Sequence, residues 1–183
     1  MSKTIIVGPS RSLSDTKLGK TIDSYDVVCR MNAGGRPDLL NGKYKEIIGT
    51  KTDIWFLGHI GLAYAHNKYN EIIITNEEYY NQHKATIKNL VLCDSKVVDL
   101  AKLKTDRVPT TGFLSIFYML NRYNDVTICG FDGFKNGHFY GNKYISTQDT
   151  SDEIAAKGFG RHNALQEIKY IENLIKGNTI KKL

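Results

Sequence analysis

The amino-acid sequence predicts an α/β fold: a single Rossmann-like domain over residues 1–183, with helices flanking a mostly parallel sheet. Three observations lead to this prediction. Short apolar runs rich in β-branched residues alternate with segments of helical periodicity. A chain of 183 residues is long enough for one buried core and short for two domains. Hydrophobic residues make up 41% of the chain and charged residues 24%, which excludes disorder over its whole length.

The strands are expected where the chain is apolar over a few residues and then reaches a turn or a polar cluster. Six such runs cover residues 4–7, 26–31, 54–57, 71–75, 89–93 and 125–130. The run at 71–75 (EIIIT) is almost continuously apolar, as expected of a strand that is buried on both faces.

Helices are expected between these strands and after the last of them. The predicted helices cover residues 13–20, 96–103, 111–123 and 162–176. Ser12 or Ser14 is the expected N-cap of the first helix. The last helix should gather four apolar side chains on one face: Leu165, Ile168, Ile171 and Ile175. Residues 134–151 are rich in Gly, Asn and Tyr and predict a long loop, which in a compact domain is often functional.

The formal net charge is +6 at pH 7. This modest excess suits an anionic ligand such as a nucleotide, or peripheral contact with an anionic membrane surface. A solvated basic surface is an equally good explanation. The charge is too diffuse to indicate nucleic-acid binding.

The three cysteines, Cys29, Cys93 and Cys129, lie far apart in apolar runs and form no metal-binding pattern. An odd number of such residues predicts buried free thiols and hence a reducing compartment. No apolar run approaches the length of a membrane span, and the N-terminal residues lead directly into a strand. We therefore expect a cytoplasmic protein that does not cross a membrane.

Four polar clusters either follow a strand or precede a helix. They are GPSRS at 8–12, RMN at 30–32, PTTG at 109–112 and GFDG at 130–133. Ligands of open α/β sheets bind outside the carboxyl ends of the strands, so these clusters are expected to converge on one site. Gly8 allows close approach of the backbone, and Thr110 and Thr111 offer hydroxyl and N–H groups to an anion. An ordinary turn and an ordinary N-cap are the alternative explanations.

Two histidines, His138 and His162, are candidates for proton transfer because imidazole titrates near neutral pH. The other three, His59, His66 and His83, are expected to be solvated or structural. The sequence contains no HExxH, no Cys/His cluster and no Asp-x-Asp, so neither a metal ion nor another cofactor is expected.

These motifs, in this order, resemble those of glycosyltransferase family 29, the sialyltransferases. The stretch IIVGPSRSL…GKTIDSYDVVCRMNAG resembles the long motif of the family, and PTTGFLSIFYMLNRYNDVTICGFDGF its short motif. HFY at 138–140 resembles the third motif, and HNALQE at 162–167 the very short one. The resemblance covers residues 4–58 and 109–167. It implies the GT-A-like variant fold of these enzymes and a compact microbial or viral member.

The resemblance also implies roles for individual residues. In that family the long and short motifs bind the cytidine monophosphate (CMP) part of a CMP-sugar donor. The implied nucleotide-binding residues are Gly8, Ser10, Asn32, Thr110, Thr111, Gly112 and Gly130. His138 would hold the phosphate, His162 would be the general base, and Glu167 would support it. The implied reaction is metal-independent, inverting transfer of sialic acid or a related acidic sugar to a glycan or glycolipid hydroxyl.

Three alternatives stay open at the level of sequence. A transferase that uses CMP-Kdo would need the same donor motifs. Pro9 stands where the family has Asn, and the acceptor region is short, so a non-catalytic nucleotide-binding module is a second alternative. A dinucleotide-dependent oxidoreductase is the third, but it would require GxGxxG, which the sequence lacks.

Overall fold

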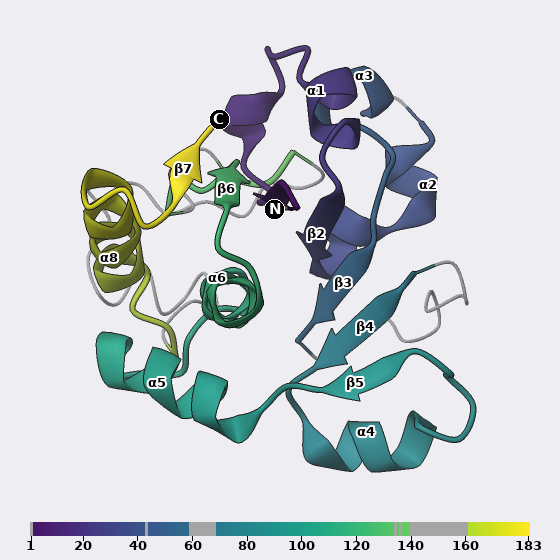
Figure 1. Cartoon of the computed structure of the whole chain (residues 1–183), viewed down its shortest axis with the longest axis vertical. Helices are drawn as coiled ribbons and strands as arrows, with labels where there is room; N and C mark the ends of the chain where they lie inside the picture. The colour runs from purple at the N-terminus through teal and green to yellow at the C-terminus, as the bar shows by residue number, and fades with distance from the viewer. Residues whose placement is uncertain (1, 43, 59–68, 134, 136, 140–160) are drawn as a thin grey trace.

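A parallel sheet of seven strands runs through the described part of the chain, in the order β5-β4-β3-β2-β1-β6-β7 (Figure 1). This computed structural model describes all residues except 1, 43, 59–68, 134, 136 and 140–160. The strands are β1 (Thr4–Val7), β2 (Val27–Met31), β3 (Ile54–Leu57), β4 (Glu71–Ile74), β5 (Leu90–Leu92), β6 (Val126–Cys129) and β7 (Lys181–Lys182). The six predicted strands are confirmed, each within one residue at either end.

The sequence pattern does not indicate β7. This edge strand has only two residues, both lysines with exposed side chains. Its backbone pairs with β6, and Lys181 Nζ lies 2.7 Å from Asp125 Oδ1. Backbone pairing without buried side chains leaves no hydrophobic signal in a sequence.

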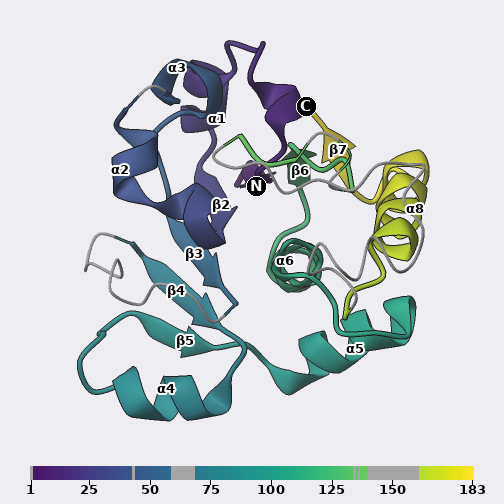
Figure 2. The same ribbon diagram turned by 180° about the vertical axis from the view of Figure 1, so that it is seen from behind.

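Helices lie on both faces of the sheet (Figures 1 and 2). The short helices η1 (Arg11–Leu13), α1 (Gly19–Asp23), η2 (Asn32–Gly35), α2 (Pro37–Leu40), α3 (Lys45–Ile48) and α4 (Glu77–His83) belong to one layer. The longer helices α5 (Ser95–Thr105), α6 (Thr111–Arg122) and α8 (Ala164–Lys176) form the other. Of the helices described, none is long and apolar enough to cross a membrane.

Strands β1 to β6 lie between the two helical layers, which cover both faces of this part of the sheet. Ile6 and Cys29 point into the core beneath α5, α6 and α8, whereas their neighbours Ile5 and Val28 point into the core beneath α1 and α3. This alternation is the two-residue period of a strand. It explains why the strands read as continuous apolar runs.

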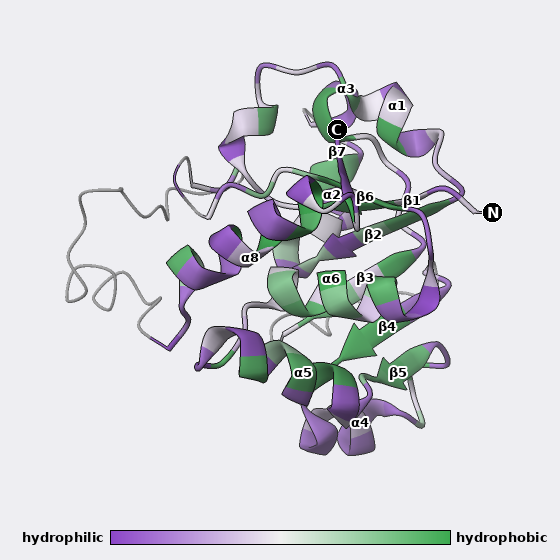
Figure 3. Cartoon of the chain, turned by 60° about the vertical axis from the view of Figure 1, so that its left-hand side comes forward, coloured by the Kyte–Doolittle hydropathy of each residue, from purple (hydrophilic) through white to green (hydrophobic). Residues whose placement is uncertain are grey.

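Helix α6 is the most hydrophobic of the longer helices, and Figure 3 shows it largely green, whereas α4 in the other layer is largely purple. Every residue from Phe113 to Met119 is buried. The hydroxyl of Thr110 accepts a hydrogen bond from the Phe113 N–H and so caps the first turn. The cap and the core together fix the start of α6 at the carboxyl edge of the sheet.

The predicted helix over 13–20 is wrong. The chain there forms the 3₁₀ turn η1, capped by Ser10, and a separate short helix, α1. The Thr16 hydroxyl donates to the Leu13 carbonyl (2.7 Å), an alternative to helical bonding that short polar side chains offer. Burial of Leu13 then pulls the turn against the sheet.

The last predicted helix is confirmed as α8, but Leu165 does not lie on its core face. Its side chain is 57% exposed, while Ala164, Glu167 and Ile171 are buried. One position along a helix turns a side chain by about 100°, so Leu165 falls outside the stripe defined by those three. Most of the predicted loop over 134–151 lies outside the described residues, as do His59 and His66.

Candidate active site

A cavity of about 730 Å³ opens where the carboxyl ends of β1, β2 and β6 meet the starts of α6 and α8. The polar clusters at 8–12, 30–32, 109–112 and 130–133 all contribute to its lining, as expected from their positions after strands and before a helix. The predicted site residues that line it are Ser10, Asn32, Thr110, Thr111, Gly112, Gly130, His138, His162 and Glu167. The structure therefore brings together nine of the ten predicted residues.

Gly8 is the exception, because it does not line the cavity. A Cβ on Gly8 would lie 2.3 Å from the Gly130 carbonyl oxygen, and a Cβ on Gly130 would lie 2.5 Å from the Gly8 oxygen. Gly130 also has a φ of +70°, which favours glycine. The two glycines leave room for each other's backbone where β1 and β6 end.

The 30–32 cluster is divided between the two faces of the sheet. Arg30 is fully buried on the face away from the cavity, where its guanidinium donates to the carbonyls of Ile48 and Lys51. It stabilises the end of α3 and makes no contribution to the cavity lining. Asn32 points the other way, with its Oδ1 accepting from the Gly58 N–H at 2.9 Å. Its φ of +45° is uncommon for a residue other than glycine.

Ser10 is joined to the segment that carries His138. Ser10 and His138 form an antiparallel bridge, and the Phe139 N–H donates to the Pro9 carbonyl at 2.9 Å. The Ser10 hydroxyl donates to Asp132 Oδ2 at 2.6 Å, and Ser10 is only 2% exposed. These contacts hold His138 at the cavity.

The first turn of α6 presents backbone N–H groups to the cavity. In the described part of the chain, the N–H groups of Thr111 and Gly112 make no hydrogen bond, whereas those of Phe113 and Leu114 are satisfied by Thr110. Such groups at a helix N-terminus favour an anion. The Thr111 side chain is partly exposed beside them.

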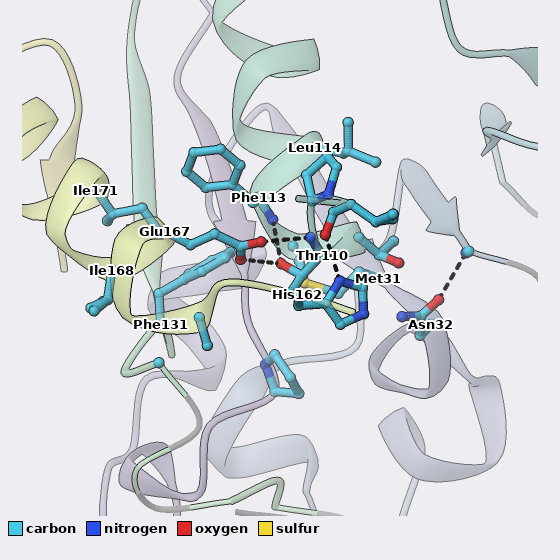
Figure 4. A pocket seen from close by; sticks show the side chains of 18 of the residues that line it. Met31, Asn32, Thr110, Phe113, Leu114, Phe131, His162, Glu167, Ile168 and Ile171 are labelled. Carbon is cyan, nitrogen blue, oxygen red and sulfur yellow. Dashed lines mark hydrogen bonds between the residues drawn. The ribbon is translucent and has the colours of Figure 1, made fainter. Parts of the chain in front are cut away.

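Glu167 holds the start of α6 from the neighbouring helix α8. Its Oε1 accepts from the Thr110 N–H at 2.7 Å, and its Oε2 accepts from the Thr110 hydroxyl at 2.6 Å (Figure 4). Burial raises the pKa of this carboxyl to about 7, although both hydrogen bonds from Thr110 oppose the shift. Both carboxyl oxygens thus contact Thr110, so Glu167 acts on the start of α6.

His162 lies beside Thr110 in the cavity (Figure 4). Its Nδ1 is 2.7 Å from the Val108 carbonyl oxygen. A carbonyl can only accept, so Nδ1 carries the proton and Nε2 keeps its lone pair. Burial lowers the pKa of His162, and the nearby charge of Arg161 adds to this effect. A neutral imidazole with a fixed tautomer is suited to accept a proton.

Three charged residues of the cavity were not singled out by their sequence motifs: Lys102, Asp132 and Arg161. Asp132 falls in the GFDG cluster, but its partner Ser10 is 122 positions away and gives no local signal. Lys102 and Arg161 have no motif around them. Among the described residues, no three His, Cys, Asp or Glu side chains gather where they could hold a metal ion.

Residues 1–92, half of the chain, match the model of glycosyltransferase family 29 (sialyltransferase), which makes this protein a glycosyltransferase. The chain belongs to family 29 within that class, the sialyltransferases. The resemblance to this family is therefore confirmed, and the matched residues include the stretch at 4–58 but not the motifs at 109–167. Comparison with curated protein sequences gives no match.

Solved sialyltransferase structures share the fold. A mammalian sialyltransferase in complex with Gal-beta-1-3GalNAc-ortho-nitrophenol gives a TM-score of 0.72 at 18% identity, over 100% of this chain and 69% of that one. A second mammalian sialyltransferase structure gives a TM-score of 0.71 at 19% identity, over 100% of this chain and 68% of that one. The third structure is the sialyltransferase CstII from Campylobacter jejuni in complex with the substrate analogue cytidine-5'-monophosphate. It gives a TM-score of 0.60 at 17% identity, over 100% of this chain and 79% of that one. The predicted GT-A-like α/β fold is confirmed.

Proposed function

We propose that this glycosyltransferase moves sialic acid or a related acidic sugar from a CMP-sugar to a hydroxyl of a glycan or glycolipid. The transfer inverts the anomeric centre and needs no metal ion. The observation that carries the proposal is the position of His162. A neutral imidazole with a fixed tautomer lines the same cavity as the N–H groups of Thr111 and Gly112, which have no hydrogen-bond partner among the described residues. A base and an anion site are thereby available to one bound donor.

The reaction is a single displacement. The acceptor oxygen bonds to the anomeric carbon from the face opposite CMP, while the bond from that carbon to the phosphate oxygen breaks. CMP leaves with the electron pair, and the hydroxyl proton passes to Nε2 of His162. The N–H groups of Thr111 and Gly112 stabilise the charge that grows on the phosphate. His138 assists them from the segment bridged to Ser10.

The nucleotide is held by groups whose positions the fold fixes. The Asn32 side-chain oxygen is engaged by Gly58, so its NH₂ group is the part available to a ligand. The Ser10 hydroxyl already donates to the Asp132 carboxylate. Ser10 therefore contributes to nucleotide binding through its backbone and through its contact with Asp132. The similar solved structures support this assignment, because one holds cytidine-5'-monophosphate and another a Gal-beta-1-3GalNAc glycoside.

Metal independence is supported by the chemistry of the leaving group. CMP is a monophosphate, and a helix N-terminus together with a histidine can balance its charge. The sequence contains no Asp-x-Asp, the usual carboxylate pair that holds a divalent ion against a nucleotide diphosphate.

Calorimetry with CMP, CDP, UDP, GDP and NAD tests the donor class, and CMP is expected to bind most tightly. Thr111→Val should weaken CMP binding by about 1.5–3 kcal/mol, because the hydrogen bond from the Thr111 hydroxyl to the charged phosphate is lost. Thr179→Val, the same change at an exposed position outside the cavity, is the control. Equal CMP affinity in wild type and Thr111→Val would show that the Thr111 hydroxyl does not contact the phosphate.

Transfer assays separate an enzyme from a binding module on the same fold. CMP-sialic acid and CMP-Kdo are offered with glycan acceptors, with and without EDTA. Sugar transfer that is unchanged by EDTA is the expected result. Binding of CMP without transfer from either donor would favour the non-catalytic alternative, and strict dependence on Mn²⁺ or Mg²⁺ would contradict the metal-free mechanism.

A further inference from the structure

Two side-chain cations, Lys102 and Arg161, line the same cavity as the proposed base. Lys102 lies on α5, and Arg161 directly precedes His162 near the start of α8. The two elements are in contact, with Asn163 Nδ2 lying 3.5 Å from the Thr105 carbonyl oxygen. The cations therefore lie on neighbouring parts of the cavity wall.

Neither cation is held by a strong partner. Lys102 Nζ lies 3.7 Å from Asp99 Oδ1, and both side chains are more than half exposed, so this pair is weak. Arg161 Nε lies 3.4 Å from Nε2 of His162, which is long for a hydrogen bond. Both groups can thus bind an incoming anion at little cost.

The carboxylates of the cavity do not balance these cations. The titratable side chains that line it are Lys102, Asp132, His138, Arg161, His162 and Glu167. Asp132 accepts the Ser10 hydroxyl, and both Glu167 oxygens accept from Thr110. The wall formed by α5 and the residues before α8 is therefore positively charged and open to a ligand.

We infer that Lys102 and Arg161 form a subsite for a sugar carboxylate, next to the reacting hydroxyl. This inference rests on the proposed function, which assigns the nucleotide phosphate to Thr111 and Gly112. The guanidinium of Arg161 suits a planar carboxylate, and Lys102 adds a point charge. The carboxylate belongs to the sugar being transferred or to an acidic sugar on the acceptor.

Binding experiments with Lys102→Met and Arg161→Met test the subsite and distinguish the two sources. The ligands are CMP, CMP-sialic acid, lactose and sialyllactose, and Lys96→Met, an exposed site on the same helix outside the cavity, is the control. We expect CMP and lactose affinities within about twofold of wild type and a roughly tenfold loss for a ligand that bears a carboxylate. A loss with CMP-sialic acid assigns the subsite to the donor, and a loss with sialyllactose assigns it to the acceptor.

Two results would overturn the inference. If both variants weaken CMP as much as CMP-sialic acid, the cations serve the phosphate. If neither variant loses more affinity for a carboxylate ligand than for its counterpart without the carboxylate, no anion subsite exists. Arg161→Lys and Lys102→Arg keep the charge and should restore most of the affinity. A wild type that fails to bind CMP contradicts the proposed function, while the comparison of sialyllactose with lactose still decides the subsite.

Discussion

At the scale of single residues, His162 has the clearest chemical role. His162→Ala should lower transfer by about 10²–10⁴-fold, the usual contribution of a general base, and leave CMP affinity within a few-fold. His138→Ala should impair both transfer and CMP binding, because this residue is assigned to the phosphate. Steady-state kinetics and calorimetry measure the two effects, with His83→Ala on α4 as the control. Equal loss of CMP affinity in both variants would mean that the two roles are assigned incorrectly.

The pH dependence of turnover follows from the environment of His162. The base must be neutral to accept a proton, and burial lowers its pKa from the usual 6.5. The active form therefore persists at pH values where an exposed histidine would be protonated. As the pH is lowered, we expect kcat to begin to decrease only below pH 6.5. An acid limb centred above pH 6.5 would contradict this assignment.

The close packing of Gly8 leads to a third prediction at this scale, which concerns stability. Its Cβ position is 2.3 Å from a backbone oxygen of Gly130, which cannot move without shifting β6. Gly8→Ala should therefore lower the free energy of unfolding by about 1–3 kcal/mol or more. Gly34→Ala is the matched control, since nothing lies within 4 Å of the Cβ position there. Denaturant unfolding of both variants gives the comparison, and equal stability would contradict the close packing.

At the scale of elements, Glu167 makes the contact between α8 and α6 dependent on pH. Its pKa rises from 4.5 to about 7 on folding, so the folded state binds the proton more tightly than the unfolded chain. The resulting stability is complete below pH 4.5 and is lost as the pH rises through about 7. The shift corresponds to roughly 3 kcal/mol at most.

Glu167→Gln should remove this part of the pH dependence. Chemical unfolding at pH 5 and pH 8 measures it, with Glu172→Gln at an exposed position of the same helix as the control. The free energy of unfolding of Glu167→Gln minus that of wild type is expected to be larger at pH 8 than at pH 5. A difference that is the same at both pH values would show that the buried carboxyl does not titrate in this range.

The elements also show which parts of the molecule a sequence can predict. Strands buried on both faces are continuous apolar runs, so all six of length three or more were predicted. The helix predicted after β1 was wrong because the hydroxyls of Ser10 and Thr16 determine the local hydrogen bonding of that segment. The convergence of polar clusters follows from parallel strands. The contact of Glu167 with Thr110, 57 positions apart, depends on helix packing and has no local pattern.

At the scale of the whole molecule, the three cysteines report on global unfolding. Cys29, Cys93 and Cys129 are buried and free, as the sequence predicted. Burial raises the pKa of Cys93 to about 11 and that of Cys129 to about 12, and it raises the pKa of Cys29 as well. Reaction with a thiol reagent requires both exposure and the thiolate form.

The native protein should therefore react negligibly with a thiol reagent at neutral pH, and all three thiols should react after denaturation. Mass spectrometry of the labelled protein counts the modified cysteines. The labelling rate in the native state should follow the free energy of unfolding, so Gly8→Ala should accelerate it at all three positions together. Rapid modification of one cysteine in the native protein would instead indicate local opening at that site.

The position of β1 has a consequence for synthesis of the chain. Among the described strands β1 is made first, and it lies between β2 and β6. On the ribosome it can pair with β2 early, but its other edge stays unpaired until residues 126–129 have emerged. Unpaired edges and exposed apolar strands promote aggregation. The nascent protein must therefore pass through a long interval in which an interior strand of its future sheet is an open edge.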